Sequence, residues 1–281
     1  PHLLAPWRRV THSASGMSAF TILVFFVSIG ILDTIHFRPA IESPSNEANT
    51  KTFSVEVLSL LDVIAAPLRS NVEKTYSAPL SAYLYAKETI ELPNGGEVRE
   101  FARLTYGGAH LVDPELNRIQ DIVTRAIVGA GWGLLFWSII ILSFTAWLAY
   151  QNKTRYWQNQ QALWCGQTEI PWWAIFMTLN VIIVVSGAVI ALATHYHVLG
   201  PDKVGQDVLY LSLKSIRTGL VIGTLTTLIM LPFALFLGIA AGYFRGWVDD
   251  VIQYTYTTLS SIPSVLLIAA AVLMMQVYIE T

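Results

Sequence analysis

The chain has 281 residues, of which 54% are hydrophobic and only 13% are charged, and its formal net charge is −2 at pH 7. A water-soluble domain of this size normally carries about a quarter charged residues, so the composition indicates a protein of the lipid bilayer. The small net charge argues against nucleic acid as a partner, and the single cysteine, Cys165, excludes an intrachain disulfide and a multi-cysteine metal site.

The first candidate membrane span covers about residues 16–32, an uncharged apolar run that follows Arg8 and Arg9. A short apolar run after a basic start is also typical of a signal peptide, but residues 30–36 contain no clear small-x-small cleavage site. We therefore expect a retained anchor, with residues 1–33 forming a cytoplasmic N-terminus and a first transmembrane helix, because basic flanks stay in the cytoplasm.

Residues 34–126 form a polar segment that this topology places outside the membrane. Within it, residues 42–50 are typical of a flexible linker, and the Pro-Asn-Gly-Gly sequence at 93–96 predicts a turn. Residues 53–61 begin an amphipathic pattern, and residues 98–106 alternate loosely, as a half-buried strand does. We expect a small α+β extracytoplasmic domain, whose lack of cysteine is compatible with a periplasm.

Two further apolar runs, at residues 127–150 and 172–193, are each long enough to cross the bilayer. About 20 helical residues span the hydrocarbon core, and a backbone in lipid must satisfy its own hydrogen bonds, so both runs are predicted helices. Residues 151–171 between them carry Lys153 and Arg155 against one glutamate, which predicts a cytoplasmic loop.

A polar, glycine-punctuated run, HYHVLGPDKVGQDVLY at residues 195–210, follows the third span. Its two histidines and two aspartates suggest a metal site, but residues two apart on a helix point to different faces, and no further strong ligand lies nearby. We favour an interfacial loop in which Asp202 caps the next helix. Residues 203–220 then form an amphipathic helix along the membrane surface.

The fourth and fifth apolar runs lie at about residues 218–244 and 262–279, and none of the five runs contains a charge in its interior. Alternation across the membrane places the run at 195–210 outside and the loop at 242–261 inside. We predict an all-α polytopic membrane protein with five transmembrane helices and a small α+β extracytoplasmic domain.

Glycine and proline residues in these spans indicate how the helices pack. Pro232 interrupts one backbone hydrogen bond and permits a kink. Gly238 and Gly242 form a small-xxx-small pattern, as do Gly129 and Gly133 in the second span. We expect both patterns to serve helix packing rather than contact with a substrate.

Three motifs follow one another between residues 195 and 279. The first reads H-x-L-G-x-D-x-x-G-x-D-V-L, and we assign to it His195, Leu199, Gly200, Asp202, Gly205 and Asp207. The second is a turn after the fourth span, with Gly242, Tyr243, Gly246 and Asp249, and the third is Ile-Pro-Ser around Pro263. Together they resemble the inner-membrane permease subunits of ABC importers, in the class that carries dipeptides, oligopeptides or nickel.

The chain departs from this family pattern at several places. Pro201, Gln206 and Arg245 stand where the family usually has threonine, arginine and glycine. Two helices and the outer domain form an N-terminal extension to the shared part, so residues 172–281 correspond to the N-terminal part of a permease domain. The resemblance implies about three further helices and an ATPase-docking helix beyond Thr281.

The resemblance implies a transport subunit of the inner (cytoplasmic) membrane that carries peptides or similar small solutes. Its implied partners are a homologous permease subunit, two ATP-binding subunits and an extracytoplasmic solute-binding protein. The chain contains no phosphate-binding G-x-x-x-x-G-K-[S/T] motif, so we expect neither an ATPase activity of its own nor a cofactor.

Two other classes of protein compete with the permease. A membrane-anchored sensor or receptor also places an outer domain between two membrane helices, but it should continue into a cytoplasmic signalling domain rather than into more membrane. A haem-carrying respiratory subunit needs histidines inside its spans, and all six histidines lie outside the five runs or at their ends.

Overall fold

The computed structural model describes residues 4–41, 52–91, 97–152, 163 and 170–279. The chain divides into two compact units, Pro1–Leu220 and Val221–Thr281, and each is considered by itself. The predicted linker at 42–50 and the predicted turn at 93–96 lie outside the described residues, as do Lys153 and Arg155 of the predicted cytoplasmic loop.

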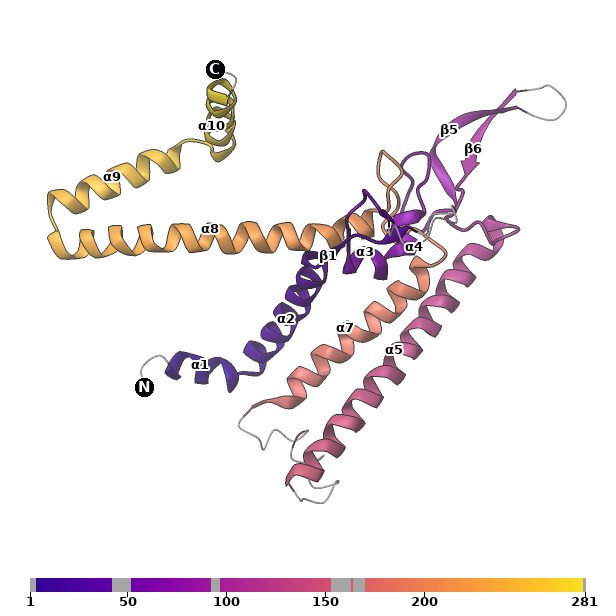
Figure 1. The fold of residues 1–281 in the computed structure, drawn as a ribbon, viewed down its shortest axis with the longest axis horizontal. Coiled ribbons are helices and arrows are strands. Elements are labelled where there is room, and N and C mark those ends of the chain that lie inside the picture. The colour runs from indigo at the N-terminus through magenta and orange to yellow at the C-terminus, as the bar shows by residue number, and fades with distance from the viewer. Residues whose placement is uncertain (1–3, 42–51, 92–96, 153–162, 164–169, 280–281) are drawn as a thin grey trace. The chain divides into compact units, whose positions relative to one another are not determined.

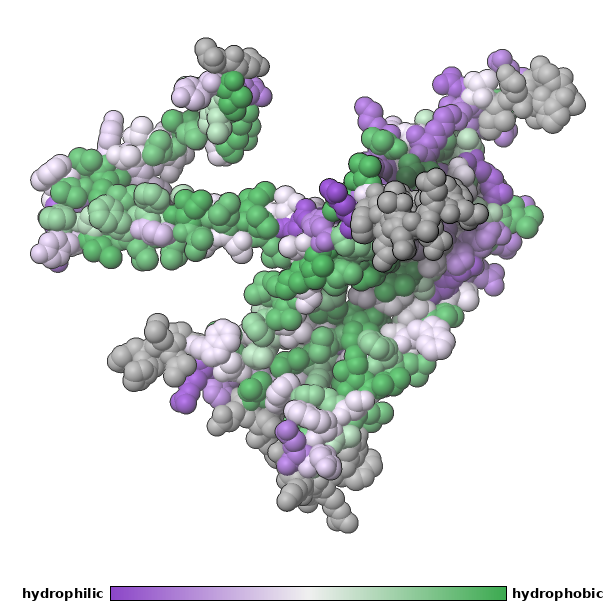
Figure 2. All heavy atoms as spheres, viewed as in Figure 1, coloured by the Kyte–Doolittle hydropathy of each residue, from purple (hydrophilic) through white to green (hydrophobic). Residues whose placement is uncertain are grey.

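Long apolar helices dominate the first unit. They are α2 (Ala14–Thr34), α5 (Pro114–Asn152), α7 (Trp172–Ala193) and the start of α8 (Val208–Phe244), and the short helix α1 (Leu4–Thr11) precedes them. By length and composition, α2, α5, α7 and α8 can each cross a membrane. In Figure 2, apolar residues cover α2, α5 and α7, while hydrophilic residues gather around the strands and short helices at one end of them. The predicted fold class, an α-helical polytopic membrane protein, is confirmed.

Two of these helices begin earlier than the apolar runs predict. Helix α5 begins at Pro114 instead of residue 127, because a polar stretch joins the span as a regular helix in which Asp121 and Arg125 form an ion pair of 2.8 Å one turn apart. Helix α8 begins at Val208 and continues without a break to Phe244. The separate surface helix predicted at 203–220 is therefore wrong, since residues 203–207 belong to the loop and residues 208–220 are the first turns of α8 itself.

Helices α5 and α7 approach each other through glycine. A Cβ atom built on Gly129 would lie 2.5 Å from the carbonyl oxygen of Gly187, and one built on Gly133 would lie 2.8 Å from that of Ile183. Trp137 on α5 also donates an indole hydrogen bond of 3.0 Å to the carbonyl oxygen of Phe176. The packing role predicted for the glycine pair of the second span is confirmed.

Short antiparallel strand pairs and two short helices form the polar segment between α2 and α5. The pairs are β1 (His36–Phe37) with β4 (Leu58–Ser59), β2 (Ala40–Ile41) with β3 (Thr52–Phe53), and β5 (Tyr83–Glu91) with β6 (Glu97–Arg103). Helices α3 (Leu60–Ile64) and α4 (Ala66–Ser70) follow β4. Among the described residues of this segment, a small core is formed by five buried apolar side chains, Leu61, Ala65, Ala82, Leu84 and Leu104. Figure 1 shows this segment at one end of α2, α5 and α7.

The β5–β6 pair differs from the half-buried strand predicted at 98–106. Every residue of β6 except Ala102 is exposed. The hairpin projects from the rest of the segment, as Figure 1 shows, and only its base, at the buried Leu84, packs into the core of that segment. Loose alternation therefore predicted the strand but not its exposure.

The second unit consists of the remainder of α8, α9 (Trp247–Ser261) and α10 (Ser264–Ile279). Pro232 lies inside α8, which continues across it. The loop predicted at 242–261 is instead mostly the helix α9, whose first turn carries Asp249 and Asp250 at the positive end of the helix dipole. Its aromatic and hydroxyl-bearing sequence, WVDDVIQYTYTTLSS, is too polar for a membrane span alone, which is why it was predicted as a loop.

The fifth predicted span is shorter than expected. Helix α10 has 16 residues, which at ~1.5 Å per residue is less than the thickness of a hydrocarbon core. Helices α9 and α10 are bent by 88° around Pro263, and only together do they qualify as a broken span. The described residues thus contain four candidate spans, or five if the bent pair counts as one.

A candidate site where the outer segment meets the loop before α8

The loop between α7 and α8 closes on itself. Asp202 accepts hydrogen bonds of 2.9 Å from the backbone N–H groups of Val204 and Gln206, and the Asp202 N–H donates to the carbonyl oxygen of Gln206 at 2.8 Å. Helix α8 is capped by Asp207, which accepts from the N–H groups of Leu209 and Tyr210 at 2.8 and 3.2 Å. The capping role predicted for Asp202 is therefore wrong, because its carboxylate is used inside the loop.

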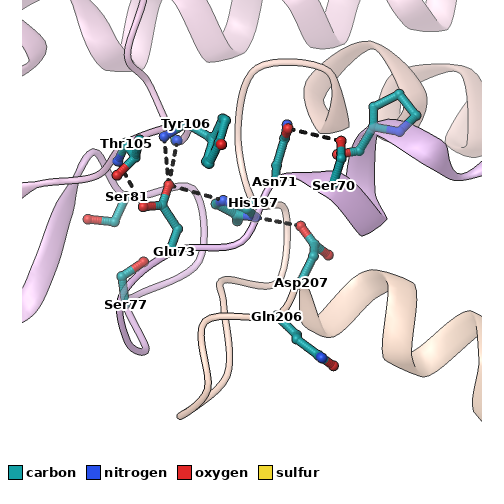
Figure 3. A network of polar contacts seen from close by, with 12 residues as sticks. Ser70, Asn71, Glu73, Ser77, Ser81, Thr105, Tyr106, His197, Gln206 and Asp207 are labelled. Carbon is teal, nitrogen blue, oxygen red and sulfur yellow. Dashed lines mark hydrogen bonds and ion pairs between the residues drawn. The ribbon is translucent and has the colours of Figure 1, made fainter. Parts of the chain in front are cut away.

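His197 lies buried between two carboxylates. Its Nδ1 is 2.6 Å from Oδ2 of Asp207, and its Nε2 is 3.4 Å from Oε1 of Glu73, which belongs to the outer segment (Figure 3). All three side chains are at most 4% exposed. Because both ring nitrogens face carboxylates, the histidine has no free lone pair to offer to a metal. Among the residues that the structure describes, no group of three or more potential ligands is arranged to hold a metal ion.

Glu73 joins two parts of the outer segment to the loop. Its carboxylate accepts backbone hydrogen bonds from Thr105, Tyr106 and Gly107 at 2.8, 2.7 and 3.0 Å (Figure 3). Its own N–H donates to the carbonyl oxygen of Gly205 at 2.9 Å. One residue thus holds the chain that follows β6 and, at the same time, the loop that precedes α8.

These contacts shift the pKa values of the buried groups. Burial alone raises the pKa of Glu73, but His197 and the three N–H groups outweigh it and bring the pKa down to about 2. Burial likewise lowers the pKa of His197, but hydrogen bonds and charge from Asp207 and Glu73 raise it to about 9. At neutral pH the site therefore holds an imidazolium between two carboxylates.

Two glycines of the loop lie against the outer segment in backbone conformations that favour glycine. Gly200 has φ +80°, and a Cβ built on it would lie 2.6 Å from the carbonyl oxygen of Ser77. Gly205 has φ +86°, and a Cβ there would overlap the carbonyl oxygen of Glu73. Any larger side chain at either position would push the outer segment away.

A second polar cluster ties α5 to the end of α7. Asp121 contacts Arg125 and His110, each at 2.8 Å, and accepts a hydrogen bond of 2.8 Å from the Tyr196 hydroxyl. Arg125 also lies 3.1 Å from Nδ1 of His195. Burial first, then the charges of Arg125 and His110, lower the pKa of His195. His195 thus belongs to this half-exposed cluster and not to the buried site around His197.

A third cluster joins α2 and α3 to the first turns of α8. Asp62 accepts from the Tyr210 hydroxyl at 2.6 Å and lies 2.9 Å from Nζ of Lys214. Asp33, the last charged residue of α2, lies 3.2 Å from Nε of Arg217 and accepts from the Ser59 hydroxyl at 2.9 Å. Burial raises the pKa of Asp62, but hydrogen bonds from Ser59, Tyr210 and Lys214 and the charge of Lys214 lower it well below its usual range.

Comparison with known proteins finds relatives of part of the chain. Over 79 residues it is 34% identical to the glutathione transport system permease protein GsiD of Pectobacterium atrosepticum, a match that covers 28% of this chain and 26% of that protein. Over this stretch the chain is similar to a permease protein of a transport system. Over 73 residues it is also 34% identical to the oligopeptide transport system permease protein OppC of Mycobacterium bovis and Mycobacterium tuberculosis, covering 26% of this chain and 25% of each relative.

The permease relationship concerns only part of the molecule, because the chain spans about a quarter of the length of the curated relatives it matches. No family model matches the chain, and no solved structure matches it. With its permease relatives and its apolar helices, the chain is a multi-pass membrane protein.

The residues of the two permease-like motifs differ in how far they are buried. In the outer loop, Gly200, Gly205 and Asp207 are buried against the outer segment, whereas Leu199 is exposed. In the second unit, Gly242 and the exposed Tyr243 lie in the last turn of α8, which ends at Phe244. Gly246 has φ +57° at the N-cap of α9, and Asp249 lies in the first turn of that helix.

Reasoning from the sequence missed two residues of the buried site. The motif spacing H-x-L-G, counted back from Leu199 and Gly200, falls on His197 rather than His195, so the spacing already contained the correct histidine. Glu73 carried no such signal, because its contact with His197 joins positions 124 residues apart.

Proposed function

We propose that this chain is a permease subunit of an ABC importer and forms part of the pathway for peptides or similar small solutes. The observation that carries the proposal is the stretch of 34% identity to permease proteins of glutathione and oligopeptide transport systems. The ordered motifs from the outer loop to the Ile-Pro-Ser sequence at Pro263 support the same reading.

In this proposal the helices repack to expose a pathway alternately to each side of the membrane, and the chain makes or breaks no bond. Pro232 gives α8 a place to bend, and the glycine pair Gly238 and Gly242 permits a close approach of another helix. A Cβ on either glycine would meet no atom of the described residues within 4 Å. A homologous permease subunit is the partner that we assign to this face.

Two ATP-binding subunits supply the energy in this scheme, and a solute-binding protein delivers the cargo. We place the chain in the inner membrane with a cytoplasmic N-terminus and with residues 34–126 outside. The C-terminal ends of α2 and α7 and the N-terminal ends of α5 and α8 all contact one another or the outer segment. This arrangement agrees with four spans that cross in alternating directions.

The extension made of α2, the outer segment and α5 offers the β5–β6 hairpin as a contact for the solute-binding protein. Deleting residues 87–101, the part of the hairpin beyond the buried Leu84, should then weaken both uptake and docking of the binding protein, measured by transport assay and by surface plasmon resonance. Unchanged values for both would remove this role from the hairpin.

Uptake in cells tests the proposed function. Uptake is measured for a set of labelled peptides and for glutathione. Deletion of the gene should abolish uptake of at least one of these solutes, and the intact gene should restore it. The purified complex should contain two ATP-binding subunits and a second permease. Unaltered uptake of every solute, together with a purified protein free of ATP-binding subunits, would contradict the proposal.

A further inference from the structure

The outer segment contacts the start of α8 through two separate polar clusters, and both are buried or half-buried. The first is a row of three side chains in contact, Glu73, His197 and Asp207, in which Asp207 accepts a hydrogen bond from a backbone N–H group of the first turn of α8. The second sets Asp33 and Asp62 against Lys214 and Arg217 on the next turns of α8. A domain carried on a loose tether would not bury charged groups against the helix beside it.

The row through His197 links the outer segment to α8 in three short steps. Backbone N–H groups after β6 hold the Glu73 carboxylate, Glu73 contacts His197, and His197 contacts Asp207. The other carboxylate oxygen of Asp207, Oδ1, accepts hydrogen bonds from the backbone N–H groups in the first turn of α8. Each side chain is therefore positioned by the one before it.

We propose that Glu73 is a positioning residue for α8, which acts through His197 and Asp207 to fix the first turn of that helix, so that the outer segment and this end of α8 move as one body. Buried charges are stable only when every partner is in place, because an unpaired buried charge loses its hydration without compensation. The junction is accordingly either closed with the whole row formed or open with the row broken.

The direction of the pH dependence follows from the groups that face His197. Glu73 and Asp207 are the charged groups in contact with it, and His195, Tyr106 and Tyr196 line the same small cavity. Because the pKa of His197 is raised to about 9, its stabilising contribution is complete below pH ~6.5 and is lost as the pH rises through about 9. Without the Glu73 charge, His197 should lose its proton at a lower pH.

The inference gains a functional meaning from the proposed permease role, since a helix that repacks during transport would then carry the outer segment with it. A protein that docks on the outer segment would act directly on α8. The structural part of the inference does not need the transport function, and it can be tested without a transport assay.

Thiol labelling in the purified full-length protein tests the junction. With Cys165→Ser as background, Ala193→Cys reports opening, because Ala193 lines the cavity beside His197 and is 8% exposed. Lys203→Cys on the exposed side of the loop serves as a reference, so the ratio of the two labelling rates cancels the intrinsic effect of pH on thiols. The parent ratio should stay low from pH 5 to 8 and rise as the pH passes about 9.

The decisive variant is Glu73→Gln, which keeps the size of the side chain and removes its charge. In this variant the labelling ratio should begin to rise at a pH about one unit lower than in the parent. In the middle of the shifted transition, Ala193→Cys should be labelled roughly tenfold faster, relative to the reference cysteine, than in the parent. The matched control is Glu88→Gln, which removes an outer-segment carboxylate whose partner is the exposed Lys74 at 2.8 Å, and it should leave the profile unchanged.

A cysteine at the opposite end of α7, Ala174→Cys, distinguishes local opening from general unfolding, because Ala174 is 3% exposed. It should stay protected in Glu73→Gln. A pH profile of Glu73→Gln that matches the parent would overturn the proposal, as would loss of protection at both positions at every pH. In the second case Glu73 would support the fold as a whole and not the junction in particular.

Discussion

The two units of this chain differ in where their specialised residues find partners. In the first unit, the loop glycines and charged residues contact other parts of the same chain, as Gly205 does with Glu73 and Asp62 with Lys214. In the second unit, Gly238 and Gly242 meet no atom of the described residues within 4 Å, and Tyr243 is 79% exposed. The first unit thus has its contacts built in, whereas the second presents an apolar surface that lipid or other helices must cover.

The largest difference between the two units is expected when one glycine in each is replaced with alanine, which adds one methyl group. Gly205→Ala should destabilise the first unit by about 3 kcal/mol, because it adds a steric overlap with Glu73 to the cost of a left-handed conformation. Gly238→Ala is the matched control in α8, where alanine favours a helix by up to ~1 kcal/mol over glycine. Thermal unfolding in detergent measures both, and equal effects would show that the contrast is not real.

Charge removal from the third cluster should give the next largest effect. Asp62→Asn should cost about 2–3 kcal/mol, because an amide keeps only one of the two buried oxygens that accept from the Ser59 N–H and the Tyr210 hydroxyl, and it no longer pairs with Lys214. Lys214→Met should cost less, about 1 kcal/mol, because the Asp62 carboxylate keeps its hydrogen bonds from the Ser59 N–H and the Tyr210 hydroxyl, and only the pairing with a partly exposed lysine is lost. Unfolding in denaturant checks the order, and a larger cost for the lysine variant would argue against a buried aspartate at the centre of this cluster.

The pH dependence sharpens the same comparison. The contribution of Glu73, whose pKa is lowered to about 2, is complete above pH ~4.5 and is lost as the pH falls through about 2. The contribution of His197, whose pKa is raised to about 9, is complete below pH ~6.5. The difference in melting temperature between the parent and Glu73→Gln should therefore be largest between pH ~4.5 and ~6.5 and should shrink on both sides, and a difference that does not vary with pH would speak against the charged row.

The smallest effect on the isolated chain is expected from a bulky residue on the uncovered face of α8. Gly238→Leu should leave the unfolding temperature of the purified chain within about 2 °C of the parent, because the side chain enters open space. In the importer that we propose, the same change should reduce uptake, since it blocks close approach of the partner helix. Normal uptake and normal assembly would place the partner contact on another face.

The sequence predicts the membrane helices well because hydropathy is a local property. Spans such as α7 are read directly from 22 consecutive uncharged and mostly apolar residues, and the Gly129 and Gly133 pair predicts how closely α5 approaches α7. The sequence does not predict α9 as a helix, because its composition is mixed and hydropathy alone does not distinguish a polar helix from a loop.

The contacts of the outer segment lie beyond what local patterns contain. Glu73 meets His197 across 124 positions and Asp62 meets Tyr210 across 148 positions. Such pairs leave no periodicity, so the sequence predicted a small outer domain but not that it is bonded to the loop before α8. The exposed state of β6 was missed for the same reason, since exposure depends on which layers lie above and below a strand.

Labelling of two single cysteines from outside the intact inner membrane tests the central claim most directly. In a Cys165→Ser background, a membrane-impermeant thiol reagent should modify Lys203→Cys, which lies on the exposed side of the loop before α8. It should reach Lys153→Cys, in the predicted cytoplasmic loop, only after the membrane has been permeabilised. The opposite pattern, with Lys153→Cys modified and Lys203→Cys protected until permeabilisation, would invert the topology and contradict the permease account.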